Sequence, residues 1–163
     1  AQHIVTDVAG RLEALTQKFD RVVVLYGDCG TAGALDKVLA RYPAARPAGL
    51  HCYEWYVGDD FQRLQAEQLG TYFLTDWLVA HWDLAVMRGL GLDRFPWLKD
   101  TYFRHITHLL YLQQQPDSTL TAEAGRIAEY LGVPLEIRHT GTDPIEAVIR
   151  QLIDLPEEAQ PVS

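Results

Sequence analysis

The sequence predicts an α/β protein with a layered, Rossmann-like fold, in which helices flank a mainly parallel sheet. Short apolar runs such as Val22–Tyr26 are typical of strands buried on both faces, the usual pattern in parallel sheets. These runs alternate with segments whose apolar residues recur every three or four positions, the spacing of an amphipathic helix. With 163 residues, 48% of them hydrophobic, the chain has the size and composition of a globular domain. We therefore expect a single domain over residues 1–155 and a flexible tail at 156–163.

The first elements are a helix, a strand and a second helix. Apolar residues from Ile4 to Phe19 recur at helical spacing, which predicts a helix over 4–19. The strand at 22–26 ends in a glycine-rich loop, and helical spacing then returns until Pro43. This strand–loop–helix unit is the basic repeat of an α/β fold.

The remaining elements continue the alternation. Strands are expected at 49–53, 72–74, 108–113 and 135–139. Helices are expected at 59–69, 76–87, 96–106 and 122–131, and a last one starts at Asp143-Pro144, a cap followed by proline. Because ligands bind beyond the carboxyl ends of parallel strands, the loops after Tyr26, Leu50 and Leu112 are the candidate binding regions.

Charge and cysteine content exclude several classes of function. The net charge is −8, whereas non-specific binding to nucleic acid or to anionic membranes needs excess positive charge. No apolar run approaches the roughly 18 residues of a transmembrane helix. Two cysteines do not form a disulfide framework, which favours a reduced setting. We therefore expect a cytoplasmic protein without nucleic-acid or membrane partners.

Both cysteines lie in segments that we expect at strand ends. Cys29 belongs to GDCG (27–30) and Cys52 to HCYE (51–54), so both would lie at one rim of a parallel sheet. Thiolates and imidazole are the usual ligands of zinc or iron, and the helix after Gly30 would stabilise a thiolate. The candidate metal ligands are Cys29, His51, Cys52 and Glu54, and their candidate surroundings are Gly27, Asp28, Gly30, Thr31, Tyr53, Trp77 and His81.

Other interpretations of the same residues remain open. Cys29 could act as a nucleophile with His51 as its base, in an enzyme without a metal. The glycines at 27, 30 and 33 have neither the dinucleotide-binding spacing nor the lysine of a phosphate-binding P-loop, so a tight turn explains them better. A cysteine can also be a small buried residue without a chemical role.

The aromatic residues suggest a third interpretation. Most of them lie between Tyr53 and Tyr111, and Trp77, His81 and Arg88 share one helical stripe. This region could form a contact face for a partner, a pocket for a planar cofactor, or an ordinary aromatic core. His105 and His108 straddle the expected end of a helix, and we interpret them as structural.

Four stretches of the chain form a recognisable set: LYGDCG at 25–30, HCYE at 51–54, GTYFLTDWL at 70–78 and LGLD at 90–93. In these stretches the chain resembles a family known as a domain of unknown function, number sixteen thirty-eight. The resemblance implies a cytoplasmic bacterial or archaeal protein, often encoded near corrinoid-dependent methyl-transfer systems. It also implies a further cysteine in an N-terminal strand, absent from this sequence. Three cysteines would suit an iron–sulfur cluster, which two alone would not complete.

We therefore expect an accessory protein that binds a metal ion, zinc or iron, an iron–sulfur cluster or another metallocofactor. Cys29 and Cys52 would be ligands, and His51 would be a third ligand or would support one. Asp28 and Glu54 would be outer ligands or would orient the imidazole. A protein of a methyl-transfer system is the expected partner, as the resemblance implies.

Overall fold

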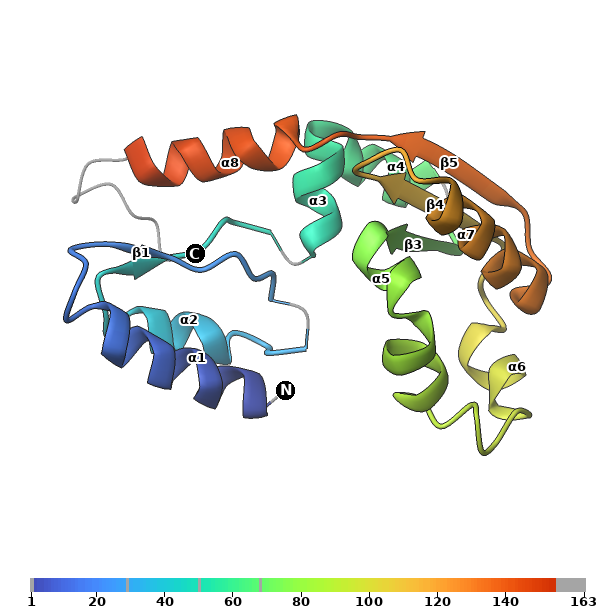
Figure 1. The fold of residues 1–163 in the computed structure, drawn as a ribbon, viewed down its shortest axis with the longest axis horizontal. Helices are drawn as coiled ribbons and strands as arrows, with labels where there is room; N and C mark the ends of the chain where they lie inside the picture. Colours follow the sequence, from blue (N-terminus) through green and yellow to red (C-terminus); the bar gives the residue numbers. More distant parts are fainter. Residues whose placement is uncertain (1, 29, 50, 68, 155–163) are drawn as a thin grey trace. The chain divides into compact units, whose positions relative to one another are not determined.

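The computed structural model describes residues 2–28, 30–49, 51–67 and 69–154, which form an α/β protein with parallel sheets flanked by helices (Figure 1). The predicted fold class is confirmed. The described chain divides into two compact units, residues 2–55 with 143–154 and residues 56–142. Whether residues 1–155 fold as a single domain, as expected from the sequence, stays a prediction. The expected tail at 156–163 lies outside the described residues.

The first unit is built on two short parallel strands. Strands β1 (Val22–Val23) and β2 (Ala44–Ala45) pair with Val22 opposite Ala44. Helices α1 (Gln2–Leu15) and α2 (Ala34–Leu39) pack against each other, and α8 (Asp143–Asp154) packs against β1. Helix α3 (Cys52–Val57) leads into the second unit. The buried core residues of the first unit are Leu12, Leu35, Val38, Leu39 and Ala44.

The second unit contains a three-stranded parallel sheet in the order β3–β4–β5. Its strands are β3 (Thr71–Thr75), β4 (His108–Gln113) and β5 (Leu135–His139). Its helices are η1 (Gly58–Asp60), α4 (Phe61–Glu67), α5 (Asp76–Ala80), the π-helix η2 (Asp83–Arg88), α6 (Leu98–Phe103) and α7 (Ser118–Leu131).

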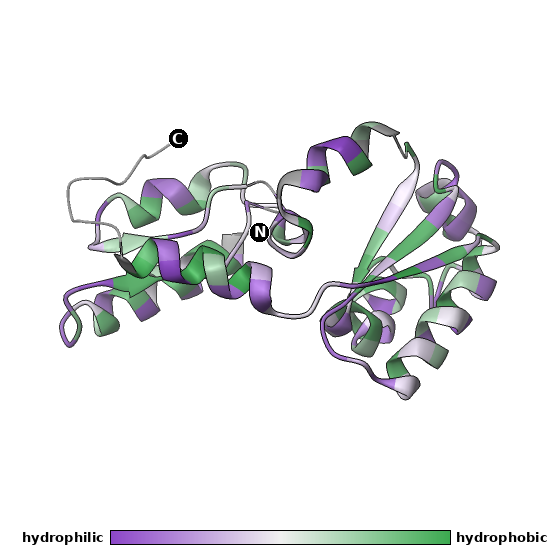
Figure 2. Ribbon diagram, turned by 90° about the horizontal axis from the view of Figure 1, so that it is seen from above, coloured by the Kyte–Doolittle hydropathy of each residue, from purple (hydrophilic) through white to green (hydrophobic). Residues whose placement is uncertain are grey.

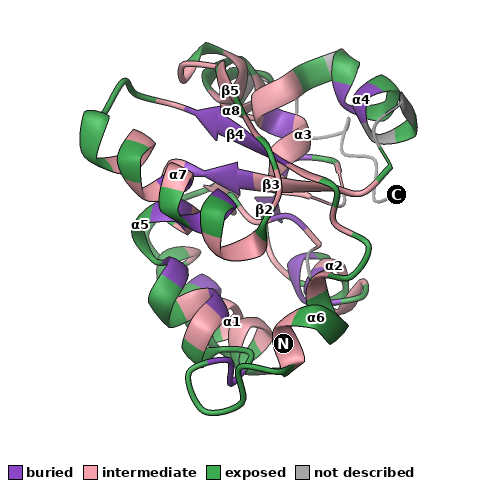
Figure 3. Cartoon of the chain, turned by 90° about the vertical axis from the view of Figure 1, so that its right-hand side faces the viewer, coloured by how far each residue is buried: buried purple, intermediate pink, exposed green. Residues whose placement is uncertain are grey.

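Strand β4 is the centre of this sheet and is buried from Leu109 to Gln113 (Figure 3). Its burial on both faces explains why its sequence is a continuous apolar run rather than an alternating one. Hydrophobic residues lie along the strands and on helix faces of the same unit (Figure 2). The core combines β3 and β4 with α5, η2 and α7, through Leu74, Val79, Trp82, Val86, Leu92, Leu109, Tyr111, Ala124, Ile127 and Ala128.

Several predicted elements agree with the structure, the strand expected at 22–26 is shortened to 22–23, and another expected strand is wrong. The strands at 108–113 and 135–139 have the predicted bounds, and Thr75 caps α5 by accepting the Leu78 N–H. The predicted strand at 49–53 is wrong, because the strand lies at 44–45 and Cys52 begins a helix. The chain leaves the sheet at Arg46, whose hydrogen bonds fold it into a turn. The apolar pattern did not predict the two-residue strand at 44–45.

The helices differ from the prediction mainly at their ends. The first one ends at Leu15 rather than at Phe19, and α7 begins at Ser118 because Asp117 caps it. The helix expected at 76–87 is divided into α5 and η2. The wide π turn ends at Gly89, where a Cβ would collide with the carbonyl oxygen of Ala85. None of the described helices has the length and apolar character needed to cross a membrane.

Candidate functional site

The candidate site lies beyond the carboxyl ends of β1 and β2. Two segments leave this edge: the β1 loop, residues 24–33, and the β2 turn, residues 46–51, both described except for Cys29 and Leu50. The β1 loop carries GDCG, and the β2 turn leads into HCYE. Because β1 and β2 are adjacent and parallel, both segments start at the edge where α/β proteins bind ligands.

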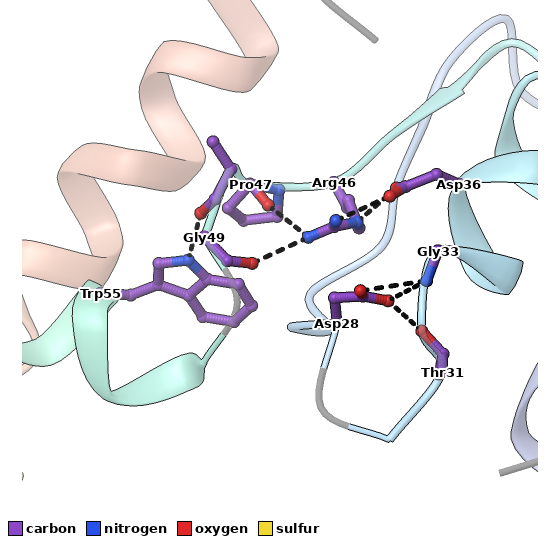
Figure 4. A network of polar contacts seen from close by, with 9 residues as sticks. Asp28, Thr31, Gly33, Asp36, Arg46, Pro47, Gly49 and Trp55 are labelled. Carbon is purple, nitrogen blue, oxygen red and sulfur yellow. Dashed lines mark hydrogen bonds and ion pairs between the residues drawn. The ribbon is translucent and has the colours of Figure 1, made fainter. Parts of the chain in front are cut away.

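The side chain of Asp28 holds the β1 loop together through hydrogen bonds within the loop. Its carboxylate accepts hydrogen bonds from the hydroxyl of buried Thr31 and from the backbone N–H of Gly33, at 2.9 and 3.0 Å from its two oxygens (Figure 4). These bonds, the Thr31 bond first, hold the pKa of Asp28 below its ordinary value of 3.8. Gly30 and Gly33 have φ angles of 74° and 76° and supply the left-handed backbone that this turn needs.

This arrangement explains the glycine pattern of the loop. The glycines make a tight turn, the interpretation that the sequence favoured over a phosphate site. Asp28 takes up the N–H of Gly33, a donor that a phosphate-binding loop would offer to its ligand. Asp28 therefore stabilises the loop that carries Cys29 in sequence.

Arg46 holds the β2 turn. Its Nε and Nη2 donate to the two oxygens of Asp36 on α2, at 2.5 and 2.9 Å, and its Nη1 donates to the carbonyl oxygens of Pro47 and Gly49, at 3.1 Å each. The side chain is 10% exposed. The hydrogen bond to Asp36 is the main cause that raises the pKa of Arg46, and the charge of Asp28 adds to it. Arg46 in turn lowers the pKa of Asp28, so the two segments interact electrostatically.

The β2 turn is also fixed from its far end. The indole Nε1 of buried Trp55 donates to the carbonyl oxygen of Ala48 at 2.8 Å. The Oε1 atom of Glu54 accepts the backbone N–H of His51 at 3.0 Å, while the Glu54 N–H donates to the carbonyl of His51 at 3.2 Å. Glu54 thus satisfies a backbone donor at the start of α3, as in a capping box. Gly49 suits this position because its φ angle of 115° lies in the region that other residues rarely adopt.

The structure describes three of the four predicted metal ligands but not Cys29. His51, Cys52, Tyr53 and Glu54 are half-buried around the start of α3, and the His51 and Tyr53 ring centroids lie 6.3 Å apart. Cys29 lies outside the described residues. Within the part of the chain that the structure describes, no three His, Cys, Asp or Glu residues form a group that could hold a metal ion. The four-ligand set therefore stays a prediction.

Trp77 and His81, predicted as surroundings of the site, belong to the second unit. Their rings stack with centroids 4.6 Å apart, and Trp77 is 60% exposed. His81 Nδ1 also lies 2.8 Å from the carbonyl oxygen of Trp77, so the pair is a local feature of α5. Nearby Trp82, in contrast, is buried in the core, as an aromatic core predicts.

Sequence reasoning missed the residues that hold the site together, namely Asp36, Arg46 and Trp55. A signal for Arg46 was present: it is the only charged residue between Tyr42 and Glu54, histidine excepted. A cation in such an apolar stretch needs a partner, because burying an unpaired charge is costly. Its partner Asp36 could not be identified from the sequence, since the pairing depends on how β2 returns beside α2.

The second sheet also has a polar cluster at its carboxyl end. Asp76 accepts hydrogen bonds from the Tyr111 hydroxyl at 2.7 Å and from the backbone N–H groups of Gln114 and Gln115 at 3.2 and 3.0 Å. Burial, followed by this hydrogen bond, raises the pKa of Tyr111. The Asp76 N–H in turn donates to Oε1 of Gln114 at 2.9 Å. The polar groups named here, at this end of the sheet, are thus hydrogen-bonded to one another.

The fold and this geometry define an α/β protein whose two motif-bearing segments follow adjacent parallel strands. A family model described as "Protein of unknown function (DUF1638)" matches residues 2–149, and the chain belongs to this family. The match confirms the resemblance stated from GDCG and HCYE. No curated protein and no solved structure matches the chain.

Proposed function

We propose that this protein binds a metal ion, zinc or iron, or a metallocofactor through Cys29 and Cys52. The observation that carries the proposal is the placement of the two motifs: the β1 loop and the β2 turn follow adjacent parallel strands, and each is held by its own hydrogen bonds. A fixed backbone suits a metal site, because ligands must meet within a few tenths of an ångström of the required distance.

The hydrogen bonds of the predicted residues suggest which of them would bind the metal and which would support the backbone. Cys52 and His51 stand at the start of α3 and supply a thiolate and an imidazole, as zinc and iron prefer. Glu54 bonds the His51 backbone through Oε1, so it would offer a metal only its other oxygen. Asp28 bonds Thr31 and Gly33, which makes it a support of the β1 loop. Three protein ligands would leave one position for water, substrate or a further ligand.

Metal content of the full chain, purified anaerobically without an affinity tag, tests the proposal. We expect near-stoichiometric zinc or iron in the wild-type protein and its loss in both Cys29→Ser and Cys52→Ser. His51→Asn should weaken binding, whereas His139→Asn, at an exposed position on β5, should not. Visible charge-transfer bands would identify iron or an iron–sulfur cluster.

The opposite result separates the metal site from the nucleophile hypothesis. A metal-free wild-type chain that cannot be loaded with zinc, iron or cobalt would overturn the metal proposal. If an alkylating probe then modified Cys29 much faster than Cys52, this reactivity would favour the alternative, an enzyme with Cys29 as nucleophile and His51 as base.

The exposed aromatic residues of the second unit support a second candidate function, partner binding. Trp77 is 60% exposed and Trp97 is 67% exposed, and large exposed aromatics are typical of interaction surfaces. The partner expected from the family resemblance is a protein of a corrinoid-dependent methyl-transfer system. Trp77→Ala should weaken binding to a purified corrinoid protein and leave metal content unchanged; unchanged binding would contradict this candidate.

A further inference from the structure

Arg46 connects the two segments that carry the cysteine motifs. Its carboxylate partner, Asp36, lies on α2, the helix that follows the β1 loop. Its carbonyl partners, Pro47 and Gly49, belong to the β2 turn, which leads into Cys52. One guanidinium group therefore ties the turn before Cys52 to the helix that follows GDCG (Figure 4).

We propose that Arg46 is a positioning residue of the metal site, which fixes the β2 turn against α2 and so sets where His51 and Cys52 stand relative to the β1 loop. The proposal rests on the function proposed above and adds a residue that would not touch the metal. Residues that orient ligands from outside the coordination sphere typically change metal affinity about tenfold to a hundredfold.

The geometry requires an arginine at this position. The planar guanidinium group of Arg46 donates four hydrogen bonds: two to the Asp36 carboxylate and two to backbone carbonyl oxygens. Lysine keeps the positive charge but has a single nitrogen, so it cannot span both sets of acceptors. Arg46→Lys thus removes the connection while preserving the charge beside Asp36 and Asp28.

The remaining contacts predict what is lost and what stays. The β2 turn keeps the bond that Trp55 donates to Ala48, and α3 keeps the bond that the His51 N–H donates to Glu54. The β1 loop keeps the bonds of Asp28. Without Arg46, the β1 loop and α3 would keep their own bonds and β1 would stay paired with β2, while the β2 turn would lose two of its bonds and its tie to α2. The site should therefore lose more than the fold does.

Titration of the metal-free full chain with Co(II), followed by its thiolate charge-transfer and d–d absorption bands, tests this role. We expect Arg46→Lys to bind Co(II) about tenfold to a hundredfold more weakly than wild type and with altered d–d bands. The matched control is Arg126→Lys, which changes an arginine paired with Glu123 on α7 and should behave as wild type. A wild-type Kd and spectrum in Arg46→Lys would overturn the proposal.

A second measurement does not depend on the metal. In a Cys29→Ser background, Cys52 is the single thiol, and its alkylation by iodoacetamide reports how the turn presents it. We expect Arg46→Lys to change this rate about threefold or more, because access and thiolate content both depend on the turn. Asp36→Asn should change it in the same direction, and it serves as the variant if Arg46→Lys does not fold. Unchanged rates in both variants would overturn the proposal.

The two measurements distinguish the proposals from each other. If wild type binds no Co(II), the proposed metal function fails, and the alkylation rates still decide whether Arg46 positions Cys52. If wild type binds Co(II) and Arg46→Lys binds it equally well, the metal function stands and the role of Arg46 fails.

Discussion

The two parallel sheets of this protein end in opposite ways. At the carboxyl end of β3 and β4, the Asp76 carboxylate accepts hydrogen bonds from the Tyr111 hydroxyl and from two backbone N–H groups, so these polar groups are paired within the protein. At the carboxyl end of β1 and β2, Asp28 holds the backbone of the β1 loop, and Arg46 holds the β2 turn, which ends at His51 and is followed by Cys52. In the first case the carboxylate serves stability, and in the second the polar groups hold the segments on which the metal site is proposed.

Removing the Asp76 carboxylate should have the largest effect on stability. Asp76→Ala leaves the buried Tyr111 hydroxyl and the N–H groups of Gln114 and Gln115 without their acceptor. We expect the free energy of unfolding to fall by about 3 kcal/mol, measured by urea denaturation. Metal binding should not change, because the cluster belongs to the second unit.

The control for this prediction is Asp100→Ala, at an exposed position on α6, which should change the free energy of unfolding by less than about 0.5 kcal/mol. If Asp76→Ala lost metal while remaining folded, the division of roles between the two sheet ends would be wrong.

Gly49 should be the next most sensitive position. Its φ angle is 115°, and an added Cβ would lie 2.8 Å from Glu54 Oε2 and 3.4 Å from Trp55 Nε1. We expect Gly49→Ala to lower the free energy of unfolding by about 2 kcal/mol and to weaken metal binding as well. Gly125→Ala on α7, where a Cβ meets nothing within 4 Å, is the control and should not destabilise the fold. A stable, metal-binding Gly49→Ala protein would show that the β2 turn is not held as described.

Loss of one hydroxyl at the carboxyl end of β4 should have a smaller effect. Tyr111→Phe removes the donor to Asp76 and leaves a carboxylate that still accepts two backbone N–H groups. We expect a loss of about 1 kcal/mol in the free energy of unfolding. A double-mutant cycle with Asp76→Ala should show coupling between the two residues, and additive losses would refute the direct bond.

The smallest effect concerns the acid sensitivity of the β1 loop. Because the folded-state pKa of Asp28 lies below 3.8, its ionised carboxylate stabilises the fold above that pH, and the stabilisation is lost as the pH falls through the lowered pKa. Thr31→Val removes the bond that lowers this pKa most, so its free energy of unfolding should depend less on pH between about 5 and 2. Identical pH profiles for Thr31→Val and wild type would contradict this assignment.

The sequence predicted the elements whose patterns are local. The apolar run around Tyr111 predicted β4 to the residue, because a central strand is buried on both faces. The strand expected at 49–53 is wrong because Cys52 begins a helix instead, and the two-residue strand at 44–45 is too short for a periodic signal. Short strands are fixed by tertiary pairing, which no local pattern records.

The candidate residues could be named from the sequence, whereas the contacts that hold their segments could not. Cysteine, histidine and glycine could be recognised from their types and from the strand ends nearby. The bond from Arg46 to Asp36 joins residues ten apart, and its geometry depends on the pairing of β1 with β2. Glu54 was expected as a ligand, and only the start of α3 at Cys52 reveals its bond to the His51 backbone.

X-ray absorption at the edge of the bound metal tests the central claim most directly, because it counts the sulfur and nitrogen neighbours of the ion. For the zinc-loaded wild-type protein we predict two sulfur ligands at about 2.3 Å and at least one imidazole nitrogen near 2.0 Å. One sulfur should disappear in Cys52→Ser. A zinc ion surrounded only by oxygen and nitrogen in the wild-type protein would contradict the account.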